Sequence, residues 1–383
     1  MGAELLAALS LVIWLFLLFA RGGFWRMRDG APQESTHNPA ARVVAVIPAR
    51  NEAPHVARAI ASLAAQSYPG PFHIVFVDDS STDGTAEAAR AAASPELLTI
   101  VRAPALPAGW TGKLWAVSQG VAEAAPLAPD FLLLTDADIV HPPEAVAGLV
   151  ARAETSGCDL VSLMVSLHCK TVPERALIPA FVFFFFLLYP PRWIANRRRK
   201  DAGAAGGCML VRREALEGIG GVESIRGELI DDCALARVIK RSGGAVKLDL
   251  SSRTHSLREY RTFSEIAQMI SRNAFTQLHH SALLLAAAAA GLLVTYIAPL
   301  ALIFTGPYPA ALLAGIAWAL MCVAYAPVLR FYRRSTFWAP LLPLVALFYL
   351  GATIHSAIAY WRGTGGMWKG RAQDTREAER GLQ

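Results

Sequence analysis

Two carboxylates, Asp136 and Asp138, stand one residue apart at the end of the apolar run "LLLTDADIV", residues 132–140. Like charges held this close repel each other and cost stability, so the pair is expected to meet a positive partner. Carboxylate oxygens are ligands that hard divalent cations prefer. A solvated turn is the alternative interpretation, but the buried run before the pair favours metal binding.

Other acidic clusters follow apolar runs of the same kind. The runs "RVVAVI" (42–47), "FHIVFV" (72–77), "LLTIVR" (97–102) and "FLLL" (131–134) alternate with helical patterns. This alternation predicts an α/β fold with a parallel, Rossmann-like sheet. Ligands of such sheets bind beyond the carboxyl ends of the strands. The polar residues expected at that edge are Asn51, Glu52, Asp78, Asp79, Asp83, Asp136 and Asp138. No G-x-G-x-x-G is present, so a dinucleotide site is not supported.

A site this rich in carboxylates suits a divalent cation, or the hydroxyl and N–H groups of a nucleotide, better than a bare anion. Lys113, at the start of a predicted helix (112–125), would supply positive charge for phosphate, as does the helix terminus itself. Asp231 and Asp232 open another predicted helix, 231–241, whose dipole keeps a carboxylate ionised.

Helix capping is the alternative role for several of these acidic residues, because Asp is favoured at helix N-termini. It applies to Asp231 and Asp232, and to the cluster after the second strand, where we expect Asp83 to be the cap. His141 and the pair His279–His280 lack metal-ligand partners at useful spacing, so we interpret them as structural.

The amino-acid composition indicates that the protein is bound to a membrane. Of 383 residues, 54% are hydrophobic and only 17% are charged, which is too apolar for an ordinary soluble protein. Apolar blocks at 5–20, 281–305, 308–329 and 337–360 approach or exceed the ~20 residues needed to cross a bilayer. The first block lacks a basic n-region, which favours a retained anchor over a signal peptide. We therefore expect an anchor (1–28), an α/β domain (42–280), transmembrane helices (281–361) and a polar tail (362–383).

Basic residues beside the apolar blocks predict the orientation. Arginines 21, 26 and 28 follow the first block and arginines 330, 333 and 334 follow the third, which places these sides, and the α/β domain, in the cytoplasm. The tail "YWRGTGGMWKGR" is basic too, although a fourth crossing would put it outside, so these two observations conflict.

The basic residues behind the net charge of +6 lie beside the apolar blocks, which indicates anionic lipid rather than nucleic acid as their partner. The five cysteines lack metal-ligand spacing and suit a reducing cytosol.

One further apolar run lies inside the predicted domain. In "IPAFVFFFFLLYPPRW" (178–193) about 14 residues are apolar, too few to span a bilayer. Arg192 and the run Arg197–Lys200 follow it. We therefore predict an interfacial segment (178–200) on anionic lipid, which forms part of the access path of a lipid substrate.

Five motifs together resemble a known family. "VIPARNEA", "VDDSSTDGT", "GWTGKLWAVSQG", "TDADI" and "IDDCALARVIKRSGG" occur in the order found in membrane-bound inverting glycosyltransferases of family 2, which have the GT-A fold. The resemblance spans about residues 43–244. "RWIANRRRKDAGAAGGCMLVRREAL" and "SRNAFTQL" are most similar to the hopanoid-biosynthesis-associated branch, with ceramide glucosyltransferase-like enzymes as near relatives.

The resemblance assigns roles to residues of this chain. It implies that Pro48, Asn51 and Glu52 line the nucleoside pocket, and that Asp79 reads the base, usually uracil. It implies that Lys113 contacts the diphosphate, and that Asp136 and Asp138 hold Mg²⁺ or Mn²⁺, with Asp138 as a direct ligand. Asp231 and Asp232 match the family's acidic pair, and the resemblance implies that Asp232 is the general base. Arg272 matches the Arg of the family's Q-x-x-R-W element.

The last of these elements departs from the family pattern. It reads "MISRN", with Met269 in place of Gln and Asn273 in place of Trp. This departure argues against a processive polysaccharide synthase.

The chemistry is consistent with these roles. A cation on the diphosphate stabilises the charge of the leaving group, and a single base on the opposite face takes the acceptor proton, which implies inversion. The sequence thus predicts a multi-pass enzyme of the bacterial inner membrane with a cytoplasmic catalytic domain. It would transfer one sugar from a nucleotide sugar, UDP-linked in most of the family, to the hydroxyl of a membrane lipid such as a hopanoid. A polyprenyl-phosphate glycosyltransferase and a non-catalytic scaffold or lipid carrier are the alternatives.

Overall fold

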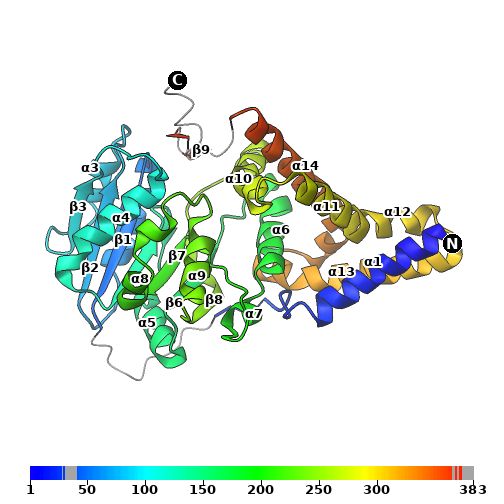
Figure 1. Ribbon diagram of the computed structural model, residues 1–383, viewed down its shortest axis with the longest axis horizontal. Coiled ribbons are helices and arrows are strands. Elements are labelled where there is room, and N and C mark those ends of the chain that lie inside the picture. Colours follow the sequence, from blue (N-terminus) through cyan, green and yellow to red (C-terminus); the bar gives the residue numbers. More distant parts are fainter. Residues whose placement is uncertain (28, 31–40, 365–366, 369–370, 373–383) are drawn as a thin grey trace. The chain divides into compact units, whose positions relative to one another are not determined.

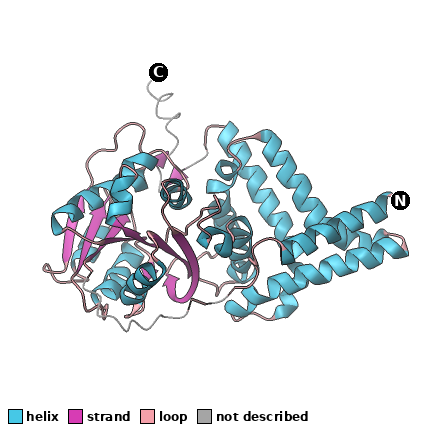
Figure 2. Cartoon of the chain, turned by 60° about the horizontal axis from the view of Figure 1, so that its bottom comes forward, coloured by secondary structure: helices cyan, strands magenta, loops and turns pink. Residues whose placement is uncertain are grey.

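The computed structural model describes residues 1–27, 29–30, 41–364, 367–368 and 371–372. The chain divides into two compact units. The α/β unit contains Asp29–His168 and Trp193–Arg258, and the helical unit contains Met1–Arg28, Cys169–Arg192 and Glu259–Gly365. Figure 2 shows the long strands in the α/β unit and the long helices in the helical unit.

An eight-stranded sheet forms the centre of the α/β unit. Its order is β3 (Leu98–Arg102), β2 (Phe72–Asp78), β1 (Val43–Ala49), β4 (Phe131–Thr135), β7 (Cys208–Arg212), β6 (Leu160–Ser166), β8 (Val246–Ser256) and β5 (Ile139–Val140). The first four strands are parallel, β7 runs antiparallel to both of its neighbours, and β6 pairs with β8 in parallel. The predicted α/β fold and its four sequence-predicted strands are confirmed.

Apolar side chains explain why these strands lie at the centre. All seven residues of β1 are buried, as a strand covered on both faces requires. Helices pack against the sheet: α2 (Ala53–Ala64), α3 (Thr85–Arg90), α4 (Gly112–Ala124), α5 (Ala145–Ser156), α8 (Arg213–Gly218) and α9 (Asp231–Arg241). Short helical turns α7 (Pro191–Ala195), η1 (Ala125–Leu127) and η2 (Val222–Ile225) complete the unit's connections.

Gly120 sets how closely α4 approaches the sheet. A Cβ atom there would lie 2.4 Å from Cγ1 of Val46 and 2.9 Å from Cγ2 of Val77. Because no other residue fits this gap, α4 packs directly on β1 and β2. The start of α4, which carries Lys113, is thereby held at the carboxyl edge of the sheet.

The helical unit is built from longer and more apolar helices (Figure 1). It contains α1 (Gly2–Phe19), α6 (Val172–Leu188), α10 (Phe263–Gln277), α11 (Ala282–Leu292), the π-helical turn η3 (Leu293–Ile297), α12 (Ala298–Thr305), α13 (Tyr308–Phe331), η4 (Thr336–Leu341) and α14 (Leu342–Trp361). Among the described residues five segments are long and apolar enough to cross a membrane: Gly2–Phe19, Val172–Ala195, Ala282–Thr305, Tyr308–Phe331 and Thr336–Trp361. Four of them coincide with the apolar blocks of the sequence.

The fifth segment differs from the sequence-based expectation. The apolar run that begins at Ile178 is too short to span, but the helix that contains it begins at Val172. A capping box starts the helix there: Thr171 Oγ1 accepts from the backbone N–H of Glu174, and Glu174 Oε2 accepts from that of Thr171. The extra turns lengthen the segment to 24 residues when α7 is included.

Candidate active site

The loops after β1 and β2 are joined by hydrogen bonds at the carboxyl edge of the sheet. The backbone N–H of Asn51 donates to Ser81 Oγ over 3.0 Å, and that of Thr82 donates to Asn51 Oδ1 over 3.0 Å. Asn51 has a φ of +51°, a conformation that Asn adopts more readily than most residues. The N–H of Glu52 donates to Thr85 Oγ1 over 2.8 Å. The two loops therefore form one connected wall, and Pro48, near the end of β1, lines the neighbouring pocket.

Asp83 caps two helices at once. Its Oδ1 accepts from the N–H of Thr85 at the start of α3, and its Oδ2 accepts from the N–H of Ala53 at the start of α2, both over 3.1 Å. The capping role expected for Asp83 is confirmed. Its carboxylate is therefore used within the wall.

Asp79, the residue expected to read a base, is fully buried. Arg50 Nη1 donates to its backbone carbonyl over 2.6 Å and lies 3.7 Å from its Oδ2. Arg50 has no place among the sequence-predicted site residues, although it stands in "PARNEA". Recognition of a base by Asp79 stays a prediction.

Asp138 is held by an arginine that the sequence analysis missed. Arg258 Nε donates to Asp138 Oδ2 over 3.0 Å, and Arg258 Nη2 lies 2.5 Å from Glu52 Oε1. Ser256 Oγ donates to the same Asp138 oxygen over 3.2 Å. The residue just after β8 thus links the carboxylates that follow β1 and β4. No spacing pattern marks Arg258, because its partners lie 120 and 206 positions away.

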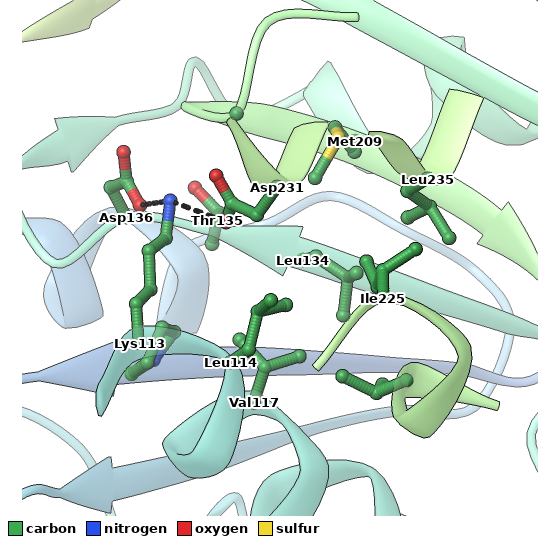
Figure 3. A pocket seen from close by; sticks show the side chains of 13 residues that line it. Lys113, Leu114, Val117, Leu134, Thr135, Asp136, Met209, Ile225, Asp231 and Leu235 are labelled. Atoms are coloured by element: carbon green, nitrogen blue, oxygen red, sulfur yellow. Dashed lines mark ion pairs between the residues drawn. The ribbon is translucent and has the colours of Figure 1, made fainter. Parts of the chain in front are cut away.

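Lys113 gathers the remaining acidic residues (Figure 3). Its Nζ lies 3.0 Å from Asp136 Oδ1 and 3.2 Å from Asp231 Oδ2, so residues from α4, the end of β4 and the start of α9 meet at one point. Burial lowers the pKa of Lys113, but Asp136, Asp231 and Asp232 together raise that pKa well above its ordinary value. The ammonium group is therefore charged at any physiological pH. Burial also raises the pKa of Asp136, an effect that Lys113 opposes and that Asp138 and Asp231 reinforce.

Asp232 lies beside this cluster with both oxygens in hydrogen bonds to backbone. Its Oδ2 accepts from the N–H of Gly206 over 2.8 Å, and its Oδ1 accepts from the N–H of Cys233 over 2.7 Å. Burial, followed by the charge of Asp231, raises the pKa of Asp232 to about 6 in spite of Lys113 and these two N–H groups. At neutral pH this carboxylate is ionised, and it is a stronger base than an ordinary one.

A pocket opens next to these residues and has two chemically different ends. Lys113, Thr135, Asp136, Gly206 and Asp231 line the polar end. The apolar lining comes from α4, η2, α9 and the strands β4 and β7: Leu114, Val117, Leu134, Met209, Val222, Ile225 and Leu235. Polar groups that converge at the mouth of an apolar pocket are the usual arrangement of a small-molecule site.

The carboxylate oxygens of Asp136 and Asp138 are suitable ligands for a hard cation, but the part of the chain that the structure describes does not supply a complete metal site on its own. Among the described residues no group of three or more His, Cys, Asp or Glu side chains could hold a metal ion. Asp136 and Asp138 each have a cationic partner, Lys113 and Arg258. Mg²⁺ is commonly bound by one or two carboxylates together with substrate phosphates and water. The oxygen donors of Asp136 and Asp138 are thus compatible with Mg²⁺ or Mn²⁺, and their role as metal ligands stays a prediction.

Two other predicted residues lie outside this cluster. Arg272 is exposed on α10 of the helical unit, so the α/β unit does not contain it. His141 is buried, with Nε2 3.0 Å from Thr135 Oγ1, and burial, helped by the nearby His255, lowers its pKa to about 4. His141 is therefore neutral, in keeping with the structural interpretation.

The fold and the comparisons with known proteins define the class. The mixed sheet with its polar carboxyl edge is a GT-A fold, and the model of glycosyl transferase family 2 matches residues 44–220. The α/β unit is thus similar to the glycosyltransferase domains of family 2, and the match covers somewhat under half of the chain. No curated protein matches the chain in sequence.

One solved structure agrees with this fold, and two others align more weakly. A mannosyltransferase from Pyrobaculum calidifontis, solved with GDP-Man and Mn²⁺, aligns with a TM-score of 0.57 and 21% identity over 93% of this chain and 99% of that one. Mannosyl-3-phosphoglycerate synthase from Rubrobacter xylanophilus aligns with a TM-score of 0.42 and 18% identity, over 68% of this chain and 84% of that one. Glucosyl-3-phosphoglycerate synthase from Mycobacterium tuberculosis gives 0.40 and 19%, over 62% and 79%. The similarity to the mannosyltransferase, at 21% identity, concerns the fold alone, and nothing is argued from the other two.

Proposed function

We propose that the protein transfers one hexose, with inversion, from a nucleoside diphosphate sugar to the hydroxyl group of a membrane lipid. The observation that carries this proposal is the meeting of Asp136, Asp231 and Asp232 around Lys113. These residues come from three distant parts of the chain. Among them, the Lys113 ammonium group can bind a diphosphate, and the Asp232 carboxylate, whose pKa is raised, can take a proton from a hydroxyl.

Each side chain then has a task in the reaction. Asp232 accepts the proton of the acceptor hydroxyl, and Asp231 keeps the pKa of Asp232 high. Lys113 neutralises phosphate oxygens, while the wall of Pro48, Asn51 and Glu52, with Asp79 behind it, faces the nucleoside. A divalent ion held by Asp136 and Asp138 would stabilise the charge of the leaving diphosphate. Arg272, which matches the Arg of the family's Q-x-x-R-W element, stays a predicted catalytic residue.

Two features support a lipid as acceptor. The apolar end of the pocket begins directly beside Asp231, where a second sugar would require hydrogen-bonding partners. The same chain carries five apolar segments of membrane-spanning length. We propose residues 1–28 as anchor, 42–280 as the cytoplasmic catalytic domain, 281–361 as further membrane helices, and the bacterial inner membrane as the location, with anionic phospholipid around the basic residues. A hopanoid or ceramide-like alcohol is the acceptor that the sequence resemblance favours.

The test is transfer of radiolabelled hexose from UDP- and GDP-linked donors to lipids in membranes that contain the protein. A labelled glycolipid that is stable to mild acid is expected with the unaltered chain and absent with Asp232→Asn. An acid-labile product that still forms with Asp232→Asn would instead identify a polyprenyl-phosphate acceptor. Metal-dependent donor binding without any product would identify a non-catalytic protein.

The interfacial segment 178–200 offers a separate test of lipid access. If it guides the acceptor, replacing Phe184 and Phe185 with Ser should raise the KM for the lipid and spare the affinity for the nucleotide sugar. Equal loss of both would assign the two side chains to packing.

A further inference from the structure

We propose that only three of the five apolar segments cross the bilayer, and that α6 and the η4–α14 segment enter the leaflet nearest the α/β unit and return to the same side. This assignment concerns membrane topology, and it holds or fails independently of the sugar transfer proposed above.

The pairing of the sheet excludes a crossing by α6. Strands β1 to β6 precede α6 in the chain, and β7 and β8 follow it. β4 nevertheless pairs with β7 over residues 131–135 and 208–212, and β6 pairs with β8 over residues 160–166 and 246–255. A single crossing by α6 would put paired strands of one sheet in different compartments. Both ends of α6 are therefore on the side of the α/β unit, whatever its length.

The crossings by α11–α12 and α13 form a hairpin. α10, which follows β8 after a short link, is too polar to span a membrane, so the start of α11 lies on the side of the α/β unit. Only residues 306 and 307 separate α12 from α13. α1 packs against this hairpin: Ala7 contacts Ala310 and Ala314 near the start of α13, and Trp14 Nε1 donates to Thr295 O over 2.9 Å. α1 and α13 therefore run in the same direction, and α13 returns to the starting side (Figure 1).

The two ends of the η4–α14 segment lie on that same side. Its beginning follows α13 after only four residues. Its end packs against the end of α10: the ring centroids of Phe275 and Trp361 are 5.5 Å apart, and the N–H of Phe275 donates to Ser356 Oγ over 3.1 Å. Phe275 lies only seven positions before the start of α11. Trp361 is thus placed at the near ends of the crossing helices.

The segment also turns back within the membrane part of the helical unit. Trp318, at the middle of α13, donates from Nε1 to the carbonyl of Pro340 over 3.3 Å. η4 therefore runs from the near end of α13 toward its middle, and Pro340 and Pro343 mark the turn into α14. In the middle of α14, Tyr349 OH donates to Leu177 O of α6 over 2.9 Å. α6 and α14 thus support each other.

The exposed face of α14 identifies its partner as lipid. Leu344, Leu347, Ile354, Ile358 and Trp361 are exposed along one side, whereas Ala346, Ala352 and Ser356 on the other side are buried. A row of exposed aliphatic side chains suits acyl chains. Tyr360 and Trp361 suit the head-group level, where aromatic residues are enriched, and the exposed Arg362 suits anionic head groups. This assignment removes the conflict over the basic tail, because residue 362 lies on the cytoplasmic side if the α/β unit does.

Single cysteines test the assignment in sealed right-side-out and inverted membrane vesicles treated with a membrane-impermeant maleimide. Arg90→Cys reports the side of the α/β unit, Ser335→Cys the end of α13, Tyr308→Cys the far side and Arg362→Cys the end of α14. All four positions are exposed. The five native cysteines are buried or half-buried, and the unaltered chain gives their background.

We expect Arg362→Cys to be labelled in the same vesicles as Arg90→Cys and Ser335→Cys, and Tyr308→Cys in the opposite ones. Labelling of Arg362→Cys together with Tyr308→Cys would show that α14 crosses and would overturn the proposal. A protease-sensitive tag after Gln383 gives a second measurement without any internal substitution. Its cleavage should occur only in vesicles that expose Arg90→Cys, and cleavage from the other face would be equally decisive against the assignment.

Discussion

Asp232 is expected to act only in its ionised form, so its pKa sets the pH at which transfer begins to fail. With a pKa of about 6, most of the carboxyl is ionised at pH 7. At pH 5 the ionised fraction falls to about a tenth, and kcat/KM should fall with it, since the rate follows the fraction of free enzyme in the basic form. A carboxyl with the ordinary Asp pKa of 3.8 would leave the rate nearly unchanged over this range.

The assay is the initial rate of hexose transfer at subsaturating acceptor in detergent-solubilised protein between pH 5 and 8. Asp231→Asn is the informative variant, because the charge of Asp231 is the second cause of the raised pKa and its removal should move the inflection to lower pH. Asp232→Asn keeps an oxygen for the N–H of Gly206 and should lower kcat by about 10²–10⁴-fold without unfolding the protein. A rate that is independent of pH from 5 to 7.5 would refute the assignment of Asp232 as base, as would an unaltered inflection in Asp231→Asn.

Three further changes have definite expected outcomes. Arg258→Lys keeps the charge but cannot contact Glu52 and Asp138 together, so the metal concentration for half-maximal transfer should rise several-fold while nearby Arg253→Lys, an exposed control, leaves it unchanged. EDTA should abolish transfer and added Mg²⁺ or Mn²⁺ should restore it; full activity after chelation would remove Asp136 and Asp138 from the metal role. Gly120→Ala places a Cβ 2.4 Å from Val46 and should cost about 1–3 kcal/mol of stability, seen as a lower unfolding temperature, whereas Gly148→Ala, with open space around it, should not.

The parts of the fold that the sequence predicts correctly are those that depend on residues close together in the chain. β1, β2, β3 and β4 are each apolar runs. Polar residues follow β1, β2 and β4, and parallel pairing brings the ends of these strands together. The meeting of Lys113 with Asp136 and Asp231 follows from the same rule, because α4 and α9 both begin at that edge. Asp83 as a cap is a matter of a few neighbouring residues.

What the sequence did not predict depends on distant partners. Arg258 looks like any exposed arginine until β8 brings it to Glu52 and Asp138. The early start of α6 depends on Glu174, a carboxylate with no exposed surface, which also accepts from the N–H of Tyr260 over 2.7 Å. Both cases involve a charged side chain whose solvation is replaced by groups far away in the chain, and no local pattern records such a replacement.

The position of β7 determines when the catalytic domain is complete during synthesis. β7 lies between β4 and β6, and it follows α6 in the chain. A ribosome that has released only the residues up to α6 has made six strands that cannot form one sheet, because the strand that joins them does not yet exist. The edges of β4 and β6 that β7 pairs with are therefore open until α6 has been synthesised, and the sheet can close only after this apolar helix.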